Sequence, residues 1–206
     1  MSSIIKVDTI DEKTPDAGVT IDGVLLKDSK IGGTITIPGS TGTMALTSDI
    51  SAGGLEVAQI FRLTTNTNST TFLKLWEAPD NTPAQGSIGS VVSVDTSTGY
   101  FSFSQTGLYL VTSSLLMFYH GNSTISNQII FTNDNFSSSD VFASKGFGAG
   151  YSSQAKAVNV SAILDIQNTT NDKFAINSIC NNTNSFTQGN TDQNMSTVSI
   201  LKLGDT

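Results

Sequence analysis

The side chains that most often carry out catalysis are scarce in this sequence. It contains one cysteine, Cys180, and one histidine, His120, which leaves no credible serine–histidine–aspartate triad or cysteine–histidine pair. Cys180 shares a strand face with Phe174 and Ile176 in an alternating apolar segment, which predicts a buried and inert thiol. Too few acidic residues follow position 51 for a carboxylate pair to be named. We therefore expect a protein that is not an enzyme.

One short segment could supply ligands to a metal ion. Asp134 and Asp140, with amides between and beside them, offer the oxygen ligands that calcium prefers. Their spacing matches no established metal-binding loop, so calcium is the one cofactor left open and no other is expected. The glycine-rich run 146–150 lacks both a following helix and a Gly-Lys-Ser/Thr sequence, so we interpret it as a loop between strands and not as a phosphate site.

Charge and hydropathy exclude two classes of partner. The net charge of the 206-residue chain is −7, and its ten basic residues are scattered. Binding to nucleic acid requires clustered lysine and arginine to neutralise phosphates, so no nucleic acid is expected. No stretch approaches the roughly 20 apolar residues of a membrane-spanning helix, and the first residues lack the layout of a signal peptide. We expect synthesis in the cytoplasm without secretion and no membrane insertion.

The distribution of charge divides the chain in two. Residues 1–50 are rich in charge and turn signals, residues 51–55 form a Gly-rich linker, and residues 56–206 are poor in charge. Within the first part, short strands are expected at Ile4–Ile10, at Val19–Ile21 running into Val24–Leu26, and at Thr34–Ile37, with a turn at Ile31–Gly33. Such strands cannot bury a core alone. They either pair with the same segment of another subunit or belong to a partly disordered tail.

The second part alternates apolar and polar residues in many short segments. Strands are expected at 57–63, 72–76, 91–94, 100–103, 108–119, 125–131, 158–166, 173–180 and 197–203. No segment has a helical period. Strands at this spacing, separated by polar turns, predict an all-β domain with two packed sheets of the jelly-roll kind.

The segment Leu108–Tyr119 is apolar on both of its alternating faces. A strand in a sheet with one solvated face should be apolar on one side only, so the second side needs a cover. Because no helix is expected, we predict that other subunits supply it. The face expected to form a trimer interface consists of Tyr109, Val111, Leu115, Met117 and Tyr119.

Three segments of the second part share a pattern with a known family. They are Tyr100–Tyr109, with its aromatic strand, turn and Gly-Leu-Tyr, the later strand Val158–Asp165, and the final strand Thr197–Gly204. Through them, residues 56–204 resemble the TNF-like jelly roll shared with the globular heads of complement and collagen-type proteins. The resemblance implies a compact homotrimer whose sheets meet along a three-fold axis.

A second resemblance lies in the first fifty residues. The segments Lys6–Ile10, Val19–Asp28, Thr34–Pro38 and Gly42–Leu46 resemble the openings of fibre-like and other virion proteins of marine tailed bacteriophages. The resemblance implies a location in the virion, with residues 1–50 attaching the trimer to other virion proteins of the tail or capsid. Ile4, Ile5, Val7 and Ile10 are the expected attachment residues.

Together these observations predict a trimeric spike or fibre whose second part binds a glycan or protein on the host surface. The expected recognition loops are Asn81–Ile88, Asn133–Tyr151 and Asn181–Asn194. Their aromatic residues either contact the receptor or fill the core and subunit interfaces: Phe136, Phe142, Phe147, Tyr151 and Phe186. Two alternatives remain open, a decoration protein on the capsid head and a secreted bacterial adhesion module of the same fold.

Overall fold

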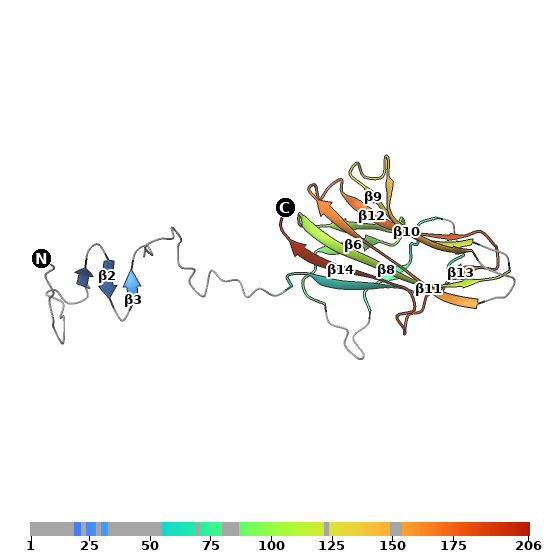
Figure 1. Cartoon of the computed structure of the whole chain (residues 1–206), viewed down its shortest axis with the longest axis horizontal. Helices are drawn as coiled ribbons and strands as arrows, with labels where there is room; N and C mark the ends of the chain where they lie inside the picture. The colour runs from blue at the N-terminus through green and yellow to red at the C-terminus, as the bar shows by residue number, and fades with distance from the viewer. Residues whose placement is uncertain are drawn as a thin grey trace, which may run out of the picture. The chain divides into compact units, whose positions relative to one another are not determined.

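The structure is a computed structural model that describes residues 19–21, 24–27, 30–32, 55–68, 71–79, 87–121, 124–148 and 154–206. The chain divides into two units, Met1–Gly54 and Leu55–Thr206. In the first unit three short strands, β1 (Val19–Ile21), β2 (Val24–Lys27) and β3 (Lys30–Gly32), form an antiparallel sheet in that order (Figure 1). The first two strands were predicted. The third replaces an expected turn at Ile31–Gly33, because its residues pair with Leu25–Lys27. The predicted strands Ile4–Ile10 and Thr34–Ile37 lie outside the described residues.

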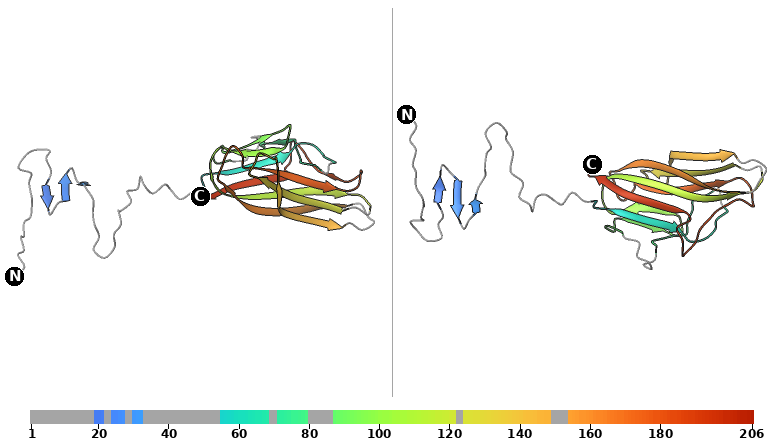
Figure 2. Two further views of the ribbon diagram at one scale, coloured as in Figure 1. Left: turned by 90° about the horizontal axis from the view of Figure 1, so that it is seen from above. Right: turned by 60° about the horizontal axis from the view of Figure 1, so that its bottom comes forward.

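The second unit is a sandwich of two antiparallel sheets, as the alternating pattern predicted (Figures 1 and 2). One sheet, called here the β8 sheet, has the order β11-β8-β14-β4-β5, with the short β13 also paired to β8. The other, called the β9 sheet, has the order β10-β9-β12-β7-β6. The β8 sheet comprises β4 (Ala58–Leu63), β5 (Trp76–Glu77), β8 (Gly107–Tyr119), β11 (Gln154–Ile166), β13 (Phe186–Thr187) and β14 (Thr197–Gly204). The β9 sheet comprises β6 (Val92–Asp95), β7 (Tyr100–Phe103), β9 (Thr124–Thr132), β10 (Asp140–Gly148) and β12 (Lys173–Cys180).

The core lies between the two sheets. It is filled by every second residue along the strands, because successive side chains point to opposite faces of a sheet. At its centre Phe101 stacks on Phe174, with ring centroids 4.5 Å apart, and the buried indole of Trp76 donates a hydrogen bond to the Leu73 carbonyl. Burying side chains of this size stabilises the fold by roughly 1.5–3 kcal/mol each. Cys180 is buried as predicted, and burial raises the pKa of its thiol above the ordinary value.

One buried polar residue links the two sheets. The Asn127 side chain on β9 donates hydrogen bonds to the carbonyls of Ser113 on β8 and Val158 on β11, and its oxygen accepts one from the Ser113 hydroxyl. All of these groups are satisfied inside the core, where an unpaired amide would be costly. The residue therefore fixes how the β9 sheet sits over the β8 sheet.

The first and last residues of the sandwich domain contact one another. The backbone N–H of Lys202 donates a hydrogen bond to the Val57 carbonyl, at 3.1 Å. The Lys202 ammonium, largely shielded from solvent, contacts the carboxylates of Glu56 and Asp205 at 3.2 and 2.6 Å. The chain thus enters and leaves the domain at neighbouring positions. None of the residues that the structure describes belongs to a helix with the length and hydropathy needed to cross a membrane.

Two expectations about individual strands were wrong. The predicted strand 72–76 is reduced to β5, and Phe72 makes only an isolated bridge to Asn177 of the other sheet. The predicted loop at 146–150 instead begins as strand, because β10 pairs with β9 as far as Gly148. The expected recognition loop Asn133–Tyr151 is wrong for the same reason, since it contains the whole of β10. A side chain at Gly146 would lie 2.8 Å from the Ile125 carbonyl oxygen, which explains a glycine within this strand.

Candidate functional site

The five residues predicted to form a trimer interface do not face outward. Tyr109, Val111, Leu115 and Met117 are fully buried within one chain, and Tyr119 is nearly so. They belong to the core cluster between the two sheets, because β8 is an interior strand with the β9 sheet packed over this face. The prediction of this face as the interface was therefore wrong. The β9 sheet of the same chain covers this face of β8, which other subunits were expected to cover.

The opposite face of β8 is partly buried and is continued by neighbouring strands. On β11 and β14 the residues paired with Leu110 are Ile163 and Leu201, and Leu201 in turn pairs with Ala58 of β4. Ala58 makes a bridge to Ile88. These five residues form an apolar row across the outside of the β8 sheet, in which Ile163 is 58% and Ile88 49% exposed.

A shallow hollow of about 190 Å³ lies beside this row. Its walls come from β4 and β14, and apolar surface predominates in it. The residues that line it are Ala58, Gln59, Ile60, Ser199 and Leu201. Towards the far end of β8, Phe118 stacks on Phe186 of β13 with ring centroids 5.1 Å apart, which extends the half-buried apolar surface along the strand. We call the apolar row together with this hollow the outer β8 face.

The predicted receptor-binding aromatics are not brought together. The ring of Phe136 stacks on that of Tyr100, with centroids 4.0 Å apart. Phe136 lies in a loop in which it and residue 135 both have positive φ angles. Phe142 is half exposed on β10, and Phe147, on the same strand, lies near two lysine ammonium groups. Phe186 belongs to the apolar surface described above. The remaining candidate, Tyr151, lies outside the described residues, as do the attachment residues Ile4, Ile5, Val7 and Ile10.

Asp134, one of the two calcium candidates, stabilises the turn in which it lies. Its carboxylate accepts hydrogen bonds from the hydroxyls of Ser138 and Thr132, both at 2.6 Å, and from the Ser138 amide at 2.9 Å. These hydrogen bonds, that of the Ser138 hydroxyl first, lower the pKa of Asp134 to about 2. Asp140 is exposed at the start of β10. In the part of the chain that the structure describes, no three histidine, cysteine or acidic side chains come together to hold a metal ion.

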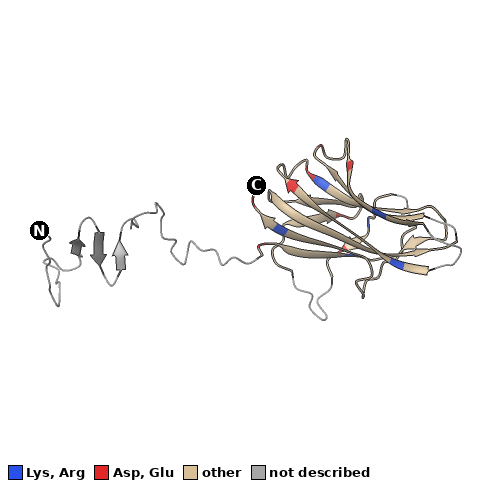
Figure 3. Cartoon of the chain, viewed as in Figure 1, with Lys and Arg blue, Asp and Glu red and all other residues tan. Residues whose placement is uncertain are grey.

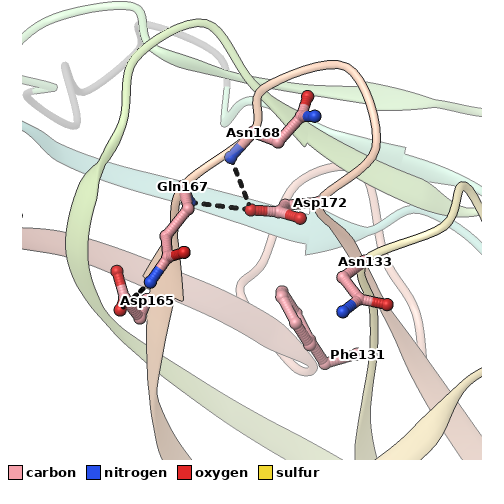
Figure 4. A pocket seen from close by; sticks show the side chains of 6 residues that line it. All are labelled: Phe131, Asn133, Asp165, Gln167, Asn168 and Asp172. Atoms are coloured by element: carbon pink, nitrogen blue, oxygen red, sulfur yellow. Dashed lines mark hydrogen bonds between the residues drawn. The ribbon is translucent and has the colours of Figure 1, made fainter.

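A polar pocket of about 370 Å³ opens where the connection after β9 approaches the connection between β11 and β12 (Figure 4). Its walls are one aromatic ring, two carboxylates and three side-chain amides. The residues are Phe131, Asn133, Asp165, Gln167, Asn168 and Asp172.

Hydrogen bonds hold one wall of this pocket in a fixed shape. The buried Asp172 carboxylate accepts the backbone amides of Gln167 and Asn168, each at 2.7 Å (Figure 4). The Asn168 side-chain oxygen accepts the amide of Thr170 at 3.0 Å, which closes the turn. The Asn171 carbonyl accepts the Asn135 amide at 3.1 Å and so joins the two connections. The pocket is therefore built before any ligand arrives.

Three polar side chains present hydrogen-bonding atoms to the pocket from its rim. The Gln167 amide donates to one oxygen of the exposed Asp165 carboxylate at 2.8 Å (Figure 4). Asn133 is exposed on the other side, next to Phe131. An arrangement of carboxylate, amides and one ring can bind hydroxyl groups and an apolar ring face. This pocket was not predicted from the sequence, although the polar residues 167–172 between two expected strands indicated a polar connection there.

Comparisons with known proteins show the fold. No protein-family model matches the sequence, and no curated protein sequence matches it. Among solved structures, a TNF protein, Eiger, from S. frugiperda is similar with 15% identity and a TM-score of 0.54, over 74% of this chain and 96% of that one. Murine APRIL is similar with 10% identity and a TM-score of 0.52, over 71% of this chain and 98% of its own. The predicted TNF-like jelly-roll fold is thus confirmed for the sandwich domain.

Proposed function

We propose that this chain assembles as a homotrimer through the outer β8 face and forms a spike or fibre on a bacteriophage particle. The observation that carries the assembly is the apolar row across the β8 sheet. Soluble monomers rarely expose contiguous apolar patches larger than roughly a few hundred Å², and here two of the five residues in the row are about half exposed.

Three copies, and not two, are supported by the TNF-like fold, for which the resemblance implies a three-fold arrangement. The proposed contact differs from the predicted one in its residues but not in its strand. Leu110 and Leu201 take the place of the inward-facing set as interface residues, because the inward-facing set is already covered.

The location on a virion is supported by the first fifty residues and their resemblance to the openings of marine bacteriophage structural proteins. In this role residues 1–50 attach to the particle and the sandwich domain contacts a glycan or protein on the host surface. Several weak contacts per trimer, multiplied over the trimers of one particle, produce stable attachment without a tight individual site.

Imaging of intact particles labelled with an antibody against the sandwich domain tests this proposal. Label on projections with three-fold symmetry at the tail is the expected result, and an antibody raised against an internal virion protein is the control. Label confined to the head shell identifies a decoration protein instead. Particles that carry no label contradict the proposal altogether.

A further inference from the structure

The pocket between the β9–β10 and β11–β12 connections has a composition that selects its ligand. Five of its six lining side chains are polar, and no lysine or arginine is among them. At about 370 Å³ it lies at the small end of the roughly 300–1,000 Å³ typical of ligand pockets. A pocket of this size with polar walls fits a small molecule rich in hydroxyl groups better than an apolar one.

The hydrogen-bonding atoms left available have fixed positions. One oxygen of the Asp165 carboxylate bonds Gln167, which leaves the other oxygen to accept from a ligand hydroxyl. The exposed Asn133 amide offers both a donor and an acceptor. The partly buried ring of Phe131 lies between these groups (Figure 4) and packs against Phe142, with ring centroids 4.9 Å apart.

A second, smaller pocket adjoins the first. It measures about 110 Å³ and shares Phe131 and Asn133 with the first. Its other lining residues are Thr132, Ser138, Ser139, Asp140 and Phe142. Two adjoining pockets with hydroxyl and carboxylate groups around a shared ring match the repeating units of an oligosaccharide better than a single small molecule.

The negative charge of the lining side chains favours neutral sugars over acidic ones. Asp165 and Asp172 line the first pocket and Asp140 the second. The ammonium group of Lys173, which follows Asp172 in the chain, binds the side-chain oxygen of Asn135 and lines neither pocket. An anionic group on the ligand would meet three carboxylates, and like charges close together are unfavourable.

We propose that these two pockets form a binding site for a neutral oligosaccharide, with one sugar ring against Phe131 and its hydroxyls bonded to Asp165 and Asn133. The proposal deepens the proposed attachment role by giving the receptor a chemical class and a place on the fold. Asp172 is a positioning residue, because it orders the connection that carries Gln167 and Asn168.

Saturation-transfer NMR on the full chain tests the site. The panel contains neutral oligomers of glucose, galactose, mannose, rhamnose and N-acetylglucosamine, and it pairs galactotriose with the galacturonate trimer, which differs by its carboxylates. We expect transfer to at least one neutral member at millimolar concentration and a preference for the neutral member of the pair. No transfer to any neutral member, or a preference for galacturonate, overturns the proposal.

Single substitutions test whether the saccharide binds in this pocket. Asp165→Asn keeps the shape but removes the charged acceptor, which weakens binding about ten-fold. Asp192→Asn, at an exposed position outside the pocket, removes the same charge and leaves binding unchanged. Phe131→Leu keeps apolar packing but removes the ring, and binding falls about five-fold. Equal affinity in Asp165→Asn and Asp192→Asn overturns the assignment, whether or not Phe131→Leu folds.

Failure of this proposal is distinguishable from failure of the proposed function. A trimer that binds no neutral saccharide refutes the pocket and leaves the assembly intact. A monomer that binds saccharide with the Asp165 dependence refutes the assembly and keeps the site.

Discussion

Replacing Ile163 by aspartate perturbs the outer β8 face without touching the core, because neighbouring residues on β11 point to opposite sides of the sheet. Ile163 is 58% exposed and pairs with Leu110, whereas Leu164 is fully buried between the sheets. The two substitutions, Ile163→Asp and Leu164→Asp, add the same charge one residue apart. They are therefore matched tests of the two faces of one strand.

The expected magnitude follows from the exposed fraction. Complete burial of an isoleucine side chain contributes roughly 1.5–3 kcal/mol, so burial of the remaining 58% contributes about 1–2 kcal/mol per subunit. Three subunits together lose about 3–6 kcal/mol in Ile163→Asp, before the desolvation of three carboxylates adds several kcal/mol more. Since each 1.4 kcal/mol is a factor of ten, the trimer dissociates at least a hundred-fold more readily.

Light scattering after size-exclusion chromatography and circular dichroism on heating are the two assays. We expect Ile163→Asp to be a folded monomer at micromolar concentration and Ile163→Val to assemble as the original chain does. Leu164→Asp should not fold, because a carboxylate in the core costs a large part of the roughly 5–15 kcal/mol by which a domain is stable. An Ile163→Asp chain that keeps the assembled mass would refute the assignment of the outer face.

Three further predictions concern the sandwich itself. Asn127→Ala should lower the free energy of unfolding in urea by about 2–4 kcal/mol, since it removes the hydrogen bonds that link the sheets; an unchanged midpoint would contradict this role. Gly99→Ala should cost about 1–3 kcal/mol by the same measurement, because its φ is +82° and an added side chain would lie 2.4 Å from the Leu73 carbonyl oxygen. Asp134 has a native pKa of about 2, below that of an unfolded carboxylate, so its contribution is present above about pH 4 and is lost as the pH falls through 2. The Ser138 amide resonance should follow that midpoint and stay constant in Asp134→Asn; a midpoint near 4 would show that the carboxylate is not held by its turn.

Most of the fold was predictable from the sequence because apolar residues alternate with a period of two along its strands. The long strands β8, β11, β12 and β14 were all predicted, and so was burial of Cys180. The two-sided strand β8 was recognised, but which side faces the partner sheet was not predictable from alternation. Both sets of residues on it are apolar, and only the side on which the β9 sheet packs decides that Met117 points inward and Leu110 outward.

The pocket could not be predicted for a different reason. Phe131 and Asn133 come from the end of β9 and the residue that follows it, and Asp165 to Asp172 from the end of β11 and the connection after it. They meet only because β9 pairs with β12 while β11 lies in the opposite sheet. Likewise, calcium binding by Asp134 could only be left open, because an acidic residue among serines and asparagines has the same composition whether it binds an ion or closes a turn.

The mass of the unmodified full chain in solution tests the central claim most directly. Light scattering at micromolar concentration should give about 65 kDa, three times the 21.6 kDa of one chain. A single species at the mass of one chain would show that the apolar row across the β8 sheet stays exposed, and would contradict the proposed trimer.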